Sequence, residues 1–333
     1  MSSPLRPVVI TTINPPVGPM AEIVLGARAR GVPVIIAGDT KTRDAAYEGF
    51  GHYLPVEEQH RRFGEFSRQL PTCHYSRKNL GYLAAAEMGA TAVQETDDDN
   101  APYESFWDAV PAMAGARTLS CERKWFNVYS LFSGEVIWPR GLPLEEVRQA
   151  GAATMRESRT RALIVQDLAD DNPDVDAVYR LTRPLPVRFR QERPVVLAPG
   201  VWCPFNSQAT IFDREVFPLL YLPSHCSFRM TDIWRSFVAQ RCLWEHGEGV
   251  VFRSPTVRQD RNEHSLLRDF EAEVPGYLHN EAIRARLEST RLAGPDPEGN
   301  LVRCYEALEQ ARLIPPAELP LVRGWCEALS RLT

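Results

Sequence analysis

Three aspartates stand side by side in the segment QETDDDNAP, residues 94–102. Neighbouring like charges repel by roughly 4 kcal/mol per pair at 4 Å and an effective dielectric near 20, so the run is either a solvated turn or the binding site of a cation. In an extended segment, Asp97 and Asp99 would point to one side and Asp98 to the other. Two carboxylates on one side suit a hard divalent cation that also binds phosphate oxygens. Such a cation neutralises the charge of a departing diphosphate.

A second acidic segment, DDNPD at residues 170–174, has a similar composition. No apolar, strand-like run leads directly into it, so we expect a solvated loop. The aspartates at 97–99, in contrast, follow a short segment that is typical of a strand. We therefore favour a cation site for the first run and a loop for the second.

Arg77 and Lys78 lie in the segment SRKNLGY, near the predicted start of a helix. The backbone N–H groups and the dipole at the start of a helix favour anions, so this pair can serve a phosphate bound in the same crevice. Taken alone, the pair is equally compatible with two surface cations. The elements that carry the pair and the aspartates decide between these two interpretations.

The first hundred residues alternate between predicted strands and helices. Short β-branched runs predict strands, and apolar residues at helical spacing with capping residues at the ends predict helices. The strands are expected at residues 7–14, 32–39 and 90–96, and the helices at residues 18–31, 55–70 and 76–89. This order predicts an α/β fold with a mostly parallel sheet and helices on both faces.

Polar residues follow each of the predicted strands. Ligands of open α/β sheets bind beyond the carboxyl ends of the strands. The polar residues at these ends are Thr11, Thr12 and Asn14 after the first strand, Asp39, Thr40 and Lys41 after the second, and the three aspartates after the last. If the strands are parallel, all of these side chains converge on one site.

The remainder of the chain is less regular. Prolines punctuate residues 183–205, which predicts extended segments and loops between two halves of one catalytic domain, and residues 232–246 have the pattern of a helix. After about residue 276 the pattern is helical. We expect a catalytic domain over residues 1–275 and a small helical C-terminal extension over residues 276–333.

The composition limits the class of protein. The chain has 333 residues, 44% of them hydrophobic, and a net charge of -5, which argues against a general nucleic-acid binder. Seven cysteines without a CxxC pair indicate free thiols in a reducing compartment. The longest apolar runs are too short to span a bilayer. We expect a cytoplasmic protein without a membrane span, and the sequence leaves its oligomeric state open.

Several segments resemble known glycosyltransferases. Arg77-Lys78-Asn79-Leu80-Gly81, followed after a helix by Asp97-Asp98-Asp99, resembles the Arg-Asn-x-Gly and Asp-x-Asp elements of GT-A enzymes. The resemblance extends in order to the STELLO family of the GT-A superfamily, over about residues 7–265. It is carried by ITTINPP at 10–16, GDTKT at 38–42, HYSRKNLGYL at 74–83, TDDDN at 96–100, WPRGLPLEEV at 138–147, CPFNSQATIF at 203–212 and DIWRSFVAQRCLWE at 232–245.

The resemblance implies donor and metal residues. In GT-A enzymes the ends of the first two strands contact the nucleoside, and the Arg-Asn element contacts the base or the diphosphate. The residues implied for the nucleotide sugar are Thr11, Asn14, Asp39, Lys41, Arg77, Asn79 and Asp98. The residues implied as ligands of Mn2+ or Mg2+ are Asp97, Asp99 and, late in the domain, His264.

The resemblance also implies an acceptor side. Inverting members use an acid at a helix start, downstream of the metal ligands, to deprotonate the acceptor hydroxyl, and Asp232 matches this position. A plain helix cap is the alternative for Asp232. Residues in family-like segments that are expected on the acceptor side are Trp138, Arg140, Asn206 and Ser207. Core packing for Trp138 and a salt bridge for Arg140 remain open.

The leading hypothesis is a metal-dependent glycosyltransferase that takes a sugar from a nucleotide diphosphate, with UDP expected. Its acceptor, whether a glycan, a small molecule or a peptide, is unidentified. One alternative is a nucleotide-sugar mutase that glycosylates one of its own arginines, and another is a non-catalytic GT-A scaffold. Neither GxGxxG nor GxxxxGK[ST] occurs, so a dinucleotide-dependent oxidoreductase and a P-loop enzyme are disfavoured.

Overall fold

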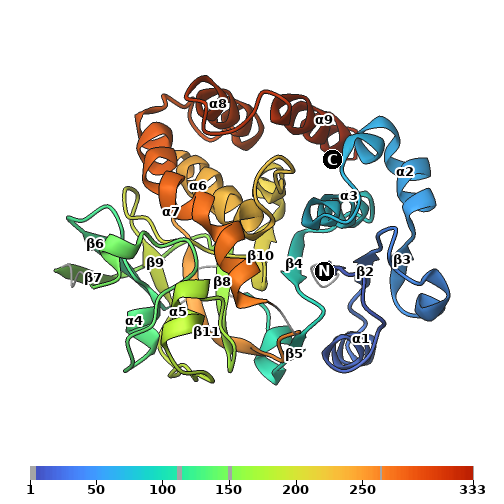
Figure 1. Ribbon diagram of the computed structural model, residues 1–333, viewed down its shortest axis with the longest axis horizontal. Helices are drawn as coiled ribbons and strands as arrows, with labels where there is room; N and C mark the ends of the chain where they lie inside the picture. Colours follow the sequence, from blue (N-terminus) through green and yellow to red (C-terminus); the bar gives the residue numbers. More distant parts are fainter. Residues whose placement is uncertain (1–4, 111–114, 149–151, 263–264, 333) are drawn as a thin grey trace.

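One large mixed sheet with helices on both faces forms the body of the molecule (Figure 1). The computed structural model describes residues 5–110, 115–148, 152–262 and 265–332. The strands are β1 Val8–Thr11, β2 Val34–Ala37, β3 His52–Leu54, β4 Ala92–Thr96, β5 Asn100–Pro102, β6 Ala116–Cys121, β7 Ala153–Ser158, β8 Ile164–Asp170, β9 Val195–Leu197, β10 Ala209–Asp213 and β11 Val251–Gln259. The helices are α1 Pro19–Ala29, α2 Val56–Gln69, α3 Lys78–Glu87, α4 Tyr129–Phe132, α5 Ala177–Thr182, α6 Thr231–Leu243, α7 Leu266–Ser289, α8 Pro297–Gln310 and α9 Glu318–Ser330.

The strand order is β3-β2-β1-β4-β10-β8-β11-β9-β6-β7, and β5 pairs with β11. The first four strands are parallel to one another. β10 runs antiparallel to both of its neighbours, β4 and β8, whereas β8 and β11 are parallel. The ends of β1, β2, β4, β8 and β11 and the start of β10 therefore meet at one edge of the sheet, as the sequence predicts for the first three.

Alternate residues of β1 belong to different cores. Val9 packs in the larger core together with Leu80 of α3, whereas Val8 and Ile10 pack with Met20 of α1. The strands and helices predicted in the first hundred residues are confirmed, and β3 is an additional short strand that was not predicted. The two cores on either face of β1 cover it on both sides, as a buried strand requires. α3 approaches β1 very closely, since a Cβ at Gly81 would lie 2.6 Å from Cγ1 of Val9.

The C-terminal helices pack on the larger core. Ile283 of α7 and Trp325 of α9 are fully buried in it, and Figure 1 shows α9 beside α2. The predicted boundary between residues 275 and 276 falls inside α7, so the division into two domains stays a prediction. Within the described ranges, every helix lacks the length or the apolar character that crossing a bilayer requires.

The segment at residues 170–174 is not the simple loop expected from the sequence. Asp170 is the last residue of β8, a fully buried strand with the sequence IVQDLAD. Its internal charge hides the strand pattern, but Asp167 forms an ion pair with Arg253 of the neighbouring β11, at 2.5 and 2.7 Å. This pairing allows a charged residue in a central strand.

Candidate active site

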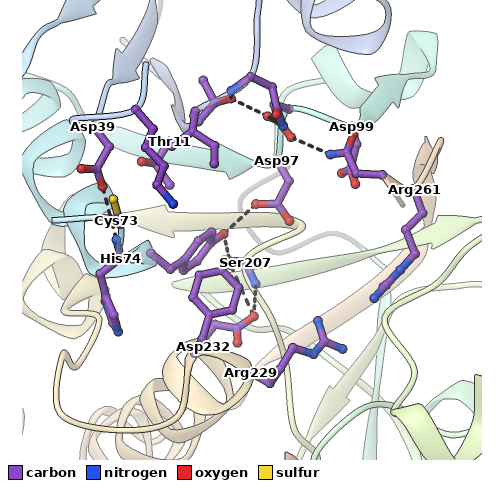
Figure 2. Close-up of a pocket in the computed structure, with 18 of the residues that line it drawn as sticks. Thr11, Asp39, Cys73, His74, Asp97, Asp99, Ser207, Arg229, Asp232 and Arg261 are labelled. Atoms are coloured by element: carbon purple, nitrogen blue, oxygen red, sulfur yellow. Dashed lines mark hydrogen bonds between the residues drawn. The ribbon is translucent and has the colours of Figure 1, made fainter. Parts of the chain in front are cut away.

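A pocket of about 460 Å³ lies at the edge of the sheet where the strand ends meet (Figure 2). It brings together most of the residues implied from the sequence. Those that line it are Thr11, Asn14, Asp39, Lys41, Asp97, Asp98, Asp99, Arg140, Ser207 and Asp232. His264, the implied third metal ligand, lies outside the described residues.

The three aspartates occupy a turn between β4 and β5. The N–H of Asn100 donates to the carbonyl of Asp97 at 3.4 Å, which closes the turn. The alternation expected for an extended segment is therefore wrong here. All three carboxylates nevertheless line the pocket, and each is held by a different set of neighbours.

Asp97 lies beside a buried cation. Its Oδ1 accepts hydrogen bonds from the Tyr75 hydroxyl at 2.6 Å and from Nζ of Lys78 at 3.2 Å. Lys78 is fully buried, and its ammonium group also donates to the Thr96 carbonyl at 2.8 Å. Burial raises the pKa of Asp97, although Lys78 and Tyr75 act in the opposite direction.

Asp98 points toward the end of β1. Its Oδ2 accepts hydrogen bonds from the Thr12 hydroxyl and, at 2.9 Å, from Nδ2 of Asn14. The N–H of Asn14 in turn donates to the Thr12 hydroxyl. The aspartate turn is thus attached to the strand end that the sequence assigns to the nucleoside.

Asp99 has a strongly perturbed carboxyl group. Both of its oxygens accept from Nε2 of Gln259, at 3.1 and 3.2 Å. Burial, followed by the charges of Asp97 and Asp98, raises the pKa of Asp99 from 3.8 to about 7. A cation between these carboxylates would remove the repulsion that causes part of the shift.

The donor set fits a divalent cation that has few protein ligands. Within the part of the chain that the structure describes, no group of three or more histidine, cysteine, aspartate or glutamate side chains is arranged around one point. Mg2+ is commonly bound by one or two carboxylates together with substrate phosphates. Asp97 and Asp99 match that pattern, with the remaining ligands left to a diphosphate and water.

The side expected to bind the nucleoside is formed by β1, β2 and the segment before α3. Asp39 is buried, and it accepts hydrogen bonds from the N–H groups of Thr40 at 2.7 Å and His74 at 3.2 Å. Thr11 lines the pocket beside it, whereas Lys41 is exposed at the rim. Asp39, Thr11 and His74 lie together on one side of the pocket in Figure 2.

Arg77 and Asn79 do not line the pocket, in contrast to the expectation from the sequence. The guanidinium group of Arg77 is buried and donates to Oε1 of Gln59 at 2.9 Å and to the Ser67 carbonyl at 3.3 Å. Asn79 exchanges two hydrogen bonds of 2.9 Å with the backbone of Leu222. Both residues therefore brace α3, and the cation that reaches the aspartates is the intervening Lys78.

Asp232 lies in a network of buried ion pairs. It is the second residue of α6, not the N-cap, which is Met230. Arg140 donates to both of its oxygens, at 2.9 and 3.0 Å, and to both oxygens of Asp174, each at 2.8 Å. Burial raises the pKa of Asp232, but Arg140 and then Arg235 outweigh burial, so its pKa is lowered. Asp232 is therefore ionised at neutral pH.

Hydrogen bonds connect Asp232 with the aspartate turn. The Ser207 hydroxyl donates to Oδ2 of Asp232 at 3.4 Å and lies 2.5 Å from the Tyr75 hydroxyl, which donates to Asp97 (Figure 2). The carbonyl of Ser207 also accepts from Lys78 at 3.3 Å. One network thus positions both carboxylates.

Two of the residues expected on the acceptor side belong to the core. The indole N–H of Trp138 donates to Asp176 at 2.7 Å, and the ring contacts Tyr179 edge-on. Asn206 accepts from the N–H of Gln208 at 2.9 Å and shapes the turn before β10. Of the alternatives considered from the sequence, Trp138 packs in the core and Arg140 forms salt bridges with Asp174 and Asp232.

Sequence reasoning missed several pocket residues. Tyr75, Phe228, Arg229, Gln259 and Arg261 all line the pocket. Phe228 is 52% exposed although it is large and apolar. Position at the end of a strand could have indicated Gln259, and position just after it Arg261, but no local pattern marks β11 as a neighbour of β8.

Comparison with known proteins finds relatives of this chain. It is 31% identical over 270 residues to "Probable glycosyltransferase STELLO2" and 30% identical over 270 residues to "Probable glycosyltransferase STELLO1", both of Arabidopsis thaliana. The aligned region covers 74% of this chain in both cases. The chain is a relative of the STELLO proteins. No protein-family model matches it.

The STELLO relationship confirms the resemblance drawn from the sequence motifs. Together with the large sheet flanked by helices, it confirms the predicted GT-A-like α/β class with additional C-terminal helices. The chain spans about a third of the length of the two STELLO proteins, 35% and 34% respectively. What those whole proteins do is therefore carried over only as a proposal.

Proposed function

We propose that this protein is a metal-dependent glycosyltransferase that uses a nucleotide diphosphate sugar, with UDP as the nucleotide. The observation that carries the proposal is the arrangement of residues around the pocket of this chain, which is similar in sequence to the STELLO proteins. The aspartate turn lies there between the ends of β1 and β2 on one side and Asp232 on the other. A donor diphosphate needs a neutralising centre, and an acceptor needs a base.

On the donor side, Asp97 and Asp99 would hold Mn2+ or Mg2+. The bound cation would supply electrostatic stabilisation of the leaving diphosphate. Lys78 donates a hydrogen bond to Asp97 and adds a positive charge next to the aspartate turn. Asp98, fastened to Thr12 and Asn14, would keep the turn against the nucleoside side.

On the acceptor side, Asp232 would accept the proton of the attacking hydroxyl. Its lowered pKa keeps it in the carboxylate form that a base requires, although a lower pKa also makes the carboxylate a weaker base. Arg140 and Ser207 fix the orientation of this carboxylate. Because Arg140 is shared with Asp174, the charge of the guanidinium group is compensated before a substrate binds.

The decisive experiment replaces a ligand and measures donor binding. Asp99→Asn should abolish Mn2+-dependent binding of UDP in calorimetry and donor turnover with a panel of UDP-sugars, because one of two carboxylate ligands is lost. Asp108→Asn changes an exposed aspartate outside the pocket and should leave UDP binding as in the unchanged protein.

Two results would contradict the proposal. Metal-dependent UDP binding that survives Asp99→Asn would remove the aspartate turn from the donor site. Absence of UDP binding in the unchanged protein would favour a scaffold. Mass spectrometry after incubation with UDP-sugars separates the transferase from the mutase, because only the mutase leaves a sugar on an arginine.

A further inference from the structure

Two arginines face each other on the side of the pocket away from Asp39. Arg229 precedes α6, and Arg261 follows β11. Both line the pocket, and Figure 2 shows their side chains directed toward one another beside Asp99 and Asp232. Two like charges in this arrangement repel, so the pair needs compensation.

Each arginine forms an ion pair with an acidic residue of α7, and Nη2 of Arg229 also lies 3.9 Å from Oδ1 of Asp174. Nε and Nη2 of Arg229 donate to Oε1 of Glu273 at 3.0 and 2.9 Å. Nη2 of Arg261 donates to Asp269 at 2.7 Å. Within the described ranges, Nη1 of Arg229 and Nε and Nη1 of Arg261 donate to no other residue. Each guanidinium group thus keeps donors available on its pocket side.

Burial and neighbouring cations both act against the charges in this corner, although Asp269, Asp174 and Asp99 offset part of the repulsion at Arg261. Burial, followed by the charge of Arg229, lowers the pKa of Arg261. Arg180 is a third arginine close to this pair. Its pKa is lowered to about 9 by burial and then by the charges of Arg261 and Arg229. An anion between Arg229 and Arg261 would relieve this repulsion, and planar guanidinium groups bind carboxylate and phosphate oxygens well.

The position of the pair indicates which substrate would carry the anion. The donor side is formed by the ends of β1 and β2 and by the aspartate turn. Arg229 lies three residues before Asp232, the proposed base. Both residues are on the side of the pocket opposite the donor side. Phe228 also lines the pocket, with its ring beside Tyr75 and His74 at centroid distances of 5.9 and 6.3 Å, and it offers an apolar face to a sugar ring.

We propose that Arg229 and Arg261 form an anion-binding subsite for the acceptor, so that the acceptor is a hydroxylated molecule carrying a carboxylate or a phosphate. This inference rests on the proposed glycosyltransferase function. The anion would anchor the acceptor while its hydroxyl group faces Asp232. A neutral sugar would give the remaining N–H donors of the two guanidinium groups no anionic partner.

Calorimetry on the full chain tests the subsite without knowledge of the natural acceptor. The protein is saturated with UDP and Mg2+ and titrated with glucose, glucuronate and glucose 6-phosphate. At least one of the two anionic sugars should bind more than about tenfold tighter than glucose, as charge-assisted hydrogen bonds imply. Comparison of glucuronate with glucose 6-phosphate shows which anion the subsite prefers.

Two variants locate the effect. Arg261→Gln should reduce the preference for the anionic sugar about tenfold or more while UDP still binds, which also shows that the variant is folded. Arg258→Gln is the matched control, because Arg258 lies on the same segment, outside the pocket, paired with Glu22 at 3.5 Å. It should leave both affinities unchanged.

The inference and the proposed function can fail separately. Equal affinity for glucose and the anionic sugars, or a preference that survives Arg261→Gln, overturns the anion subsite while UDP binding stands. If Arg261→Gln weakens UDP as much as the anionic sugar, the arginines serve the donor diphosphate and the inference is also overturned. If UDP does not bind but the preference for the anionic sugar is present, the subsite stands and the proposed donor is wrong.

Discussion

At the scale of single residues, the pocket depends on charges that the fold holds in unfavourable surroundings. Lys78 is fully buried against Asp97, and Arg140 is buried between Asp174 and Asp232. Groups of this kind are costly unless they are paired and hydrogen-bonded. Their concentration around one pocket is typical of a functional site.

Asp232→Asn tests the role of the proposed base. Asparagine keeps the shape of the side chain but cannot accept the proton. The rate of sugar transfer to the acceptor should therefore fall by about a hundredfold or more, while UDP binding is retained. Asp174→Asn is the matched control, because Asp174 also binds Arg140 through both oxygens but does not line the pocket. Equal losses of transfer in the two variants would show that Asp232 acts only through Arg140.

The pKa of Asp99 predicts how stability depends on pH in the metal-free protein. The folded-state pKa is about 7 and the ordinary value is 3.8. Between these values the folded protein binds more protons than the unfolded chain, so the free energy of unfolding falls as pH rises through the window. Each unit of pKa shift corresponds to about 1.4 kcal/mol.

Asp99→Asn removes this carboxylate and should reduce the loss of stability between about pH 4 and pH 7. Urea unfolding with a metal chelator, repeated across this range, measures the free energy of unfolding of both proteins. The variant should be the more stable of the two above pH 7. Parallel curves for the two proteins would show that Asp99 is not perturbed by its neighbours.

At the scale of elements, the close contact of α3 with β1 positions the buried lysine. α3 begins at Lys78, and glycine at position 81 lets the helix approach Val9. This approach brings the start of the helix against the end of β4, where Lys78 contacts Thr96 and Asp97. The geometry of the aspartate turn therefore depends on Gly81, a residue without a side chain.

Gly81→Leu should destabilise the protein by roughly 1–3 kcal/mol, because the added side chain collides with Val9 in a packed core. Gly134→Leu is the control, since a Cβ at Gly134 meets nothing within 4 Å. Thermal or urea unfolding of the two variants measures the difference. A Gly81→Leu variant as stable as the control would mean that α3 can move away from β1 without cost.

At the scale of the whole molecule, the C-terminal helices support the pocket from behind. Glu273 of α7 holds Arg229, and Glu318 at the start of α9 accepts from the N–H groups of Ser224 and His225, at 3.0 and 2.7 Å. The segment between β10 and α6 is thereby fixed from outside. These contacts give a structural role to helices in which the sequence shows no chemistry.

Trp325→Ala tests whether these helices fold as one unit with the sheet. Trp325 is fully buried and contacts Phe66 of α2 and Tyr221, so its loss should cost roughly 3–5 kcal/mol. Leu278→Ala is the control, because Leu278 is 69% exposed on α7. A single, shifted unfolding transition is expected for Trp325→Ala. A separate early transition, with the main transition unchanged, would indicate an independent C-terminal domain.

Local sequence patterns predict the alternating strands and helices of the first hundred residues and most of the residues on the donor side of the pocket. Short β-branched runs and periodic helices are local patterns, and polar residues such as Thr11, Asp39 and Asp97 directly follow predicted strands. Because parallel strands end at one edge, these residues could be placed together without coordinates. The GT-A-like class followed from the same patterns and the motifs that resemble STELLO proteins.

The pairing of the charged residues, in contrast, depends on how the chain folds in three dimensions. Arg77 and Lys78 are adjacent in the chain, but their side chains point in different directions at the start of α3, so Arg77 contacts Gln59 of α2 and Lys78 reaches Asp97. Arg140, Asp174 and Asp232 lie far apart in the chain, and only the folded protein brings Arg140 within hydrogen-bond distance of both carboxylates. Long-range pairing of this kind leaves no local pattern, because its energy depends on the removal of water by the folded protein.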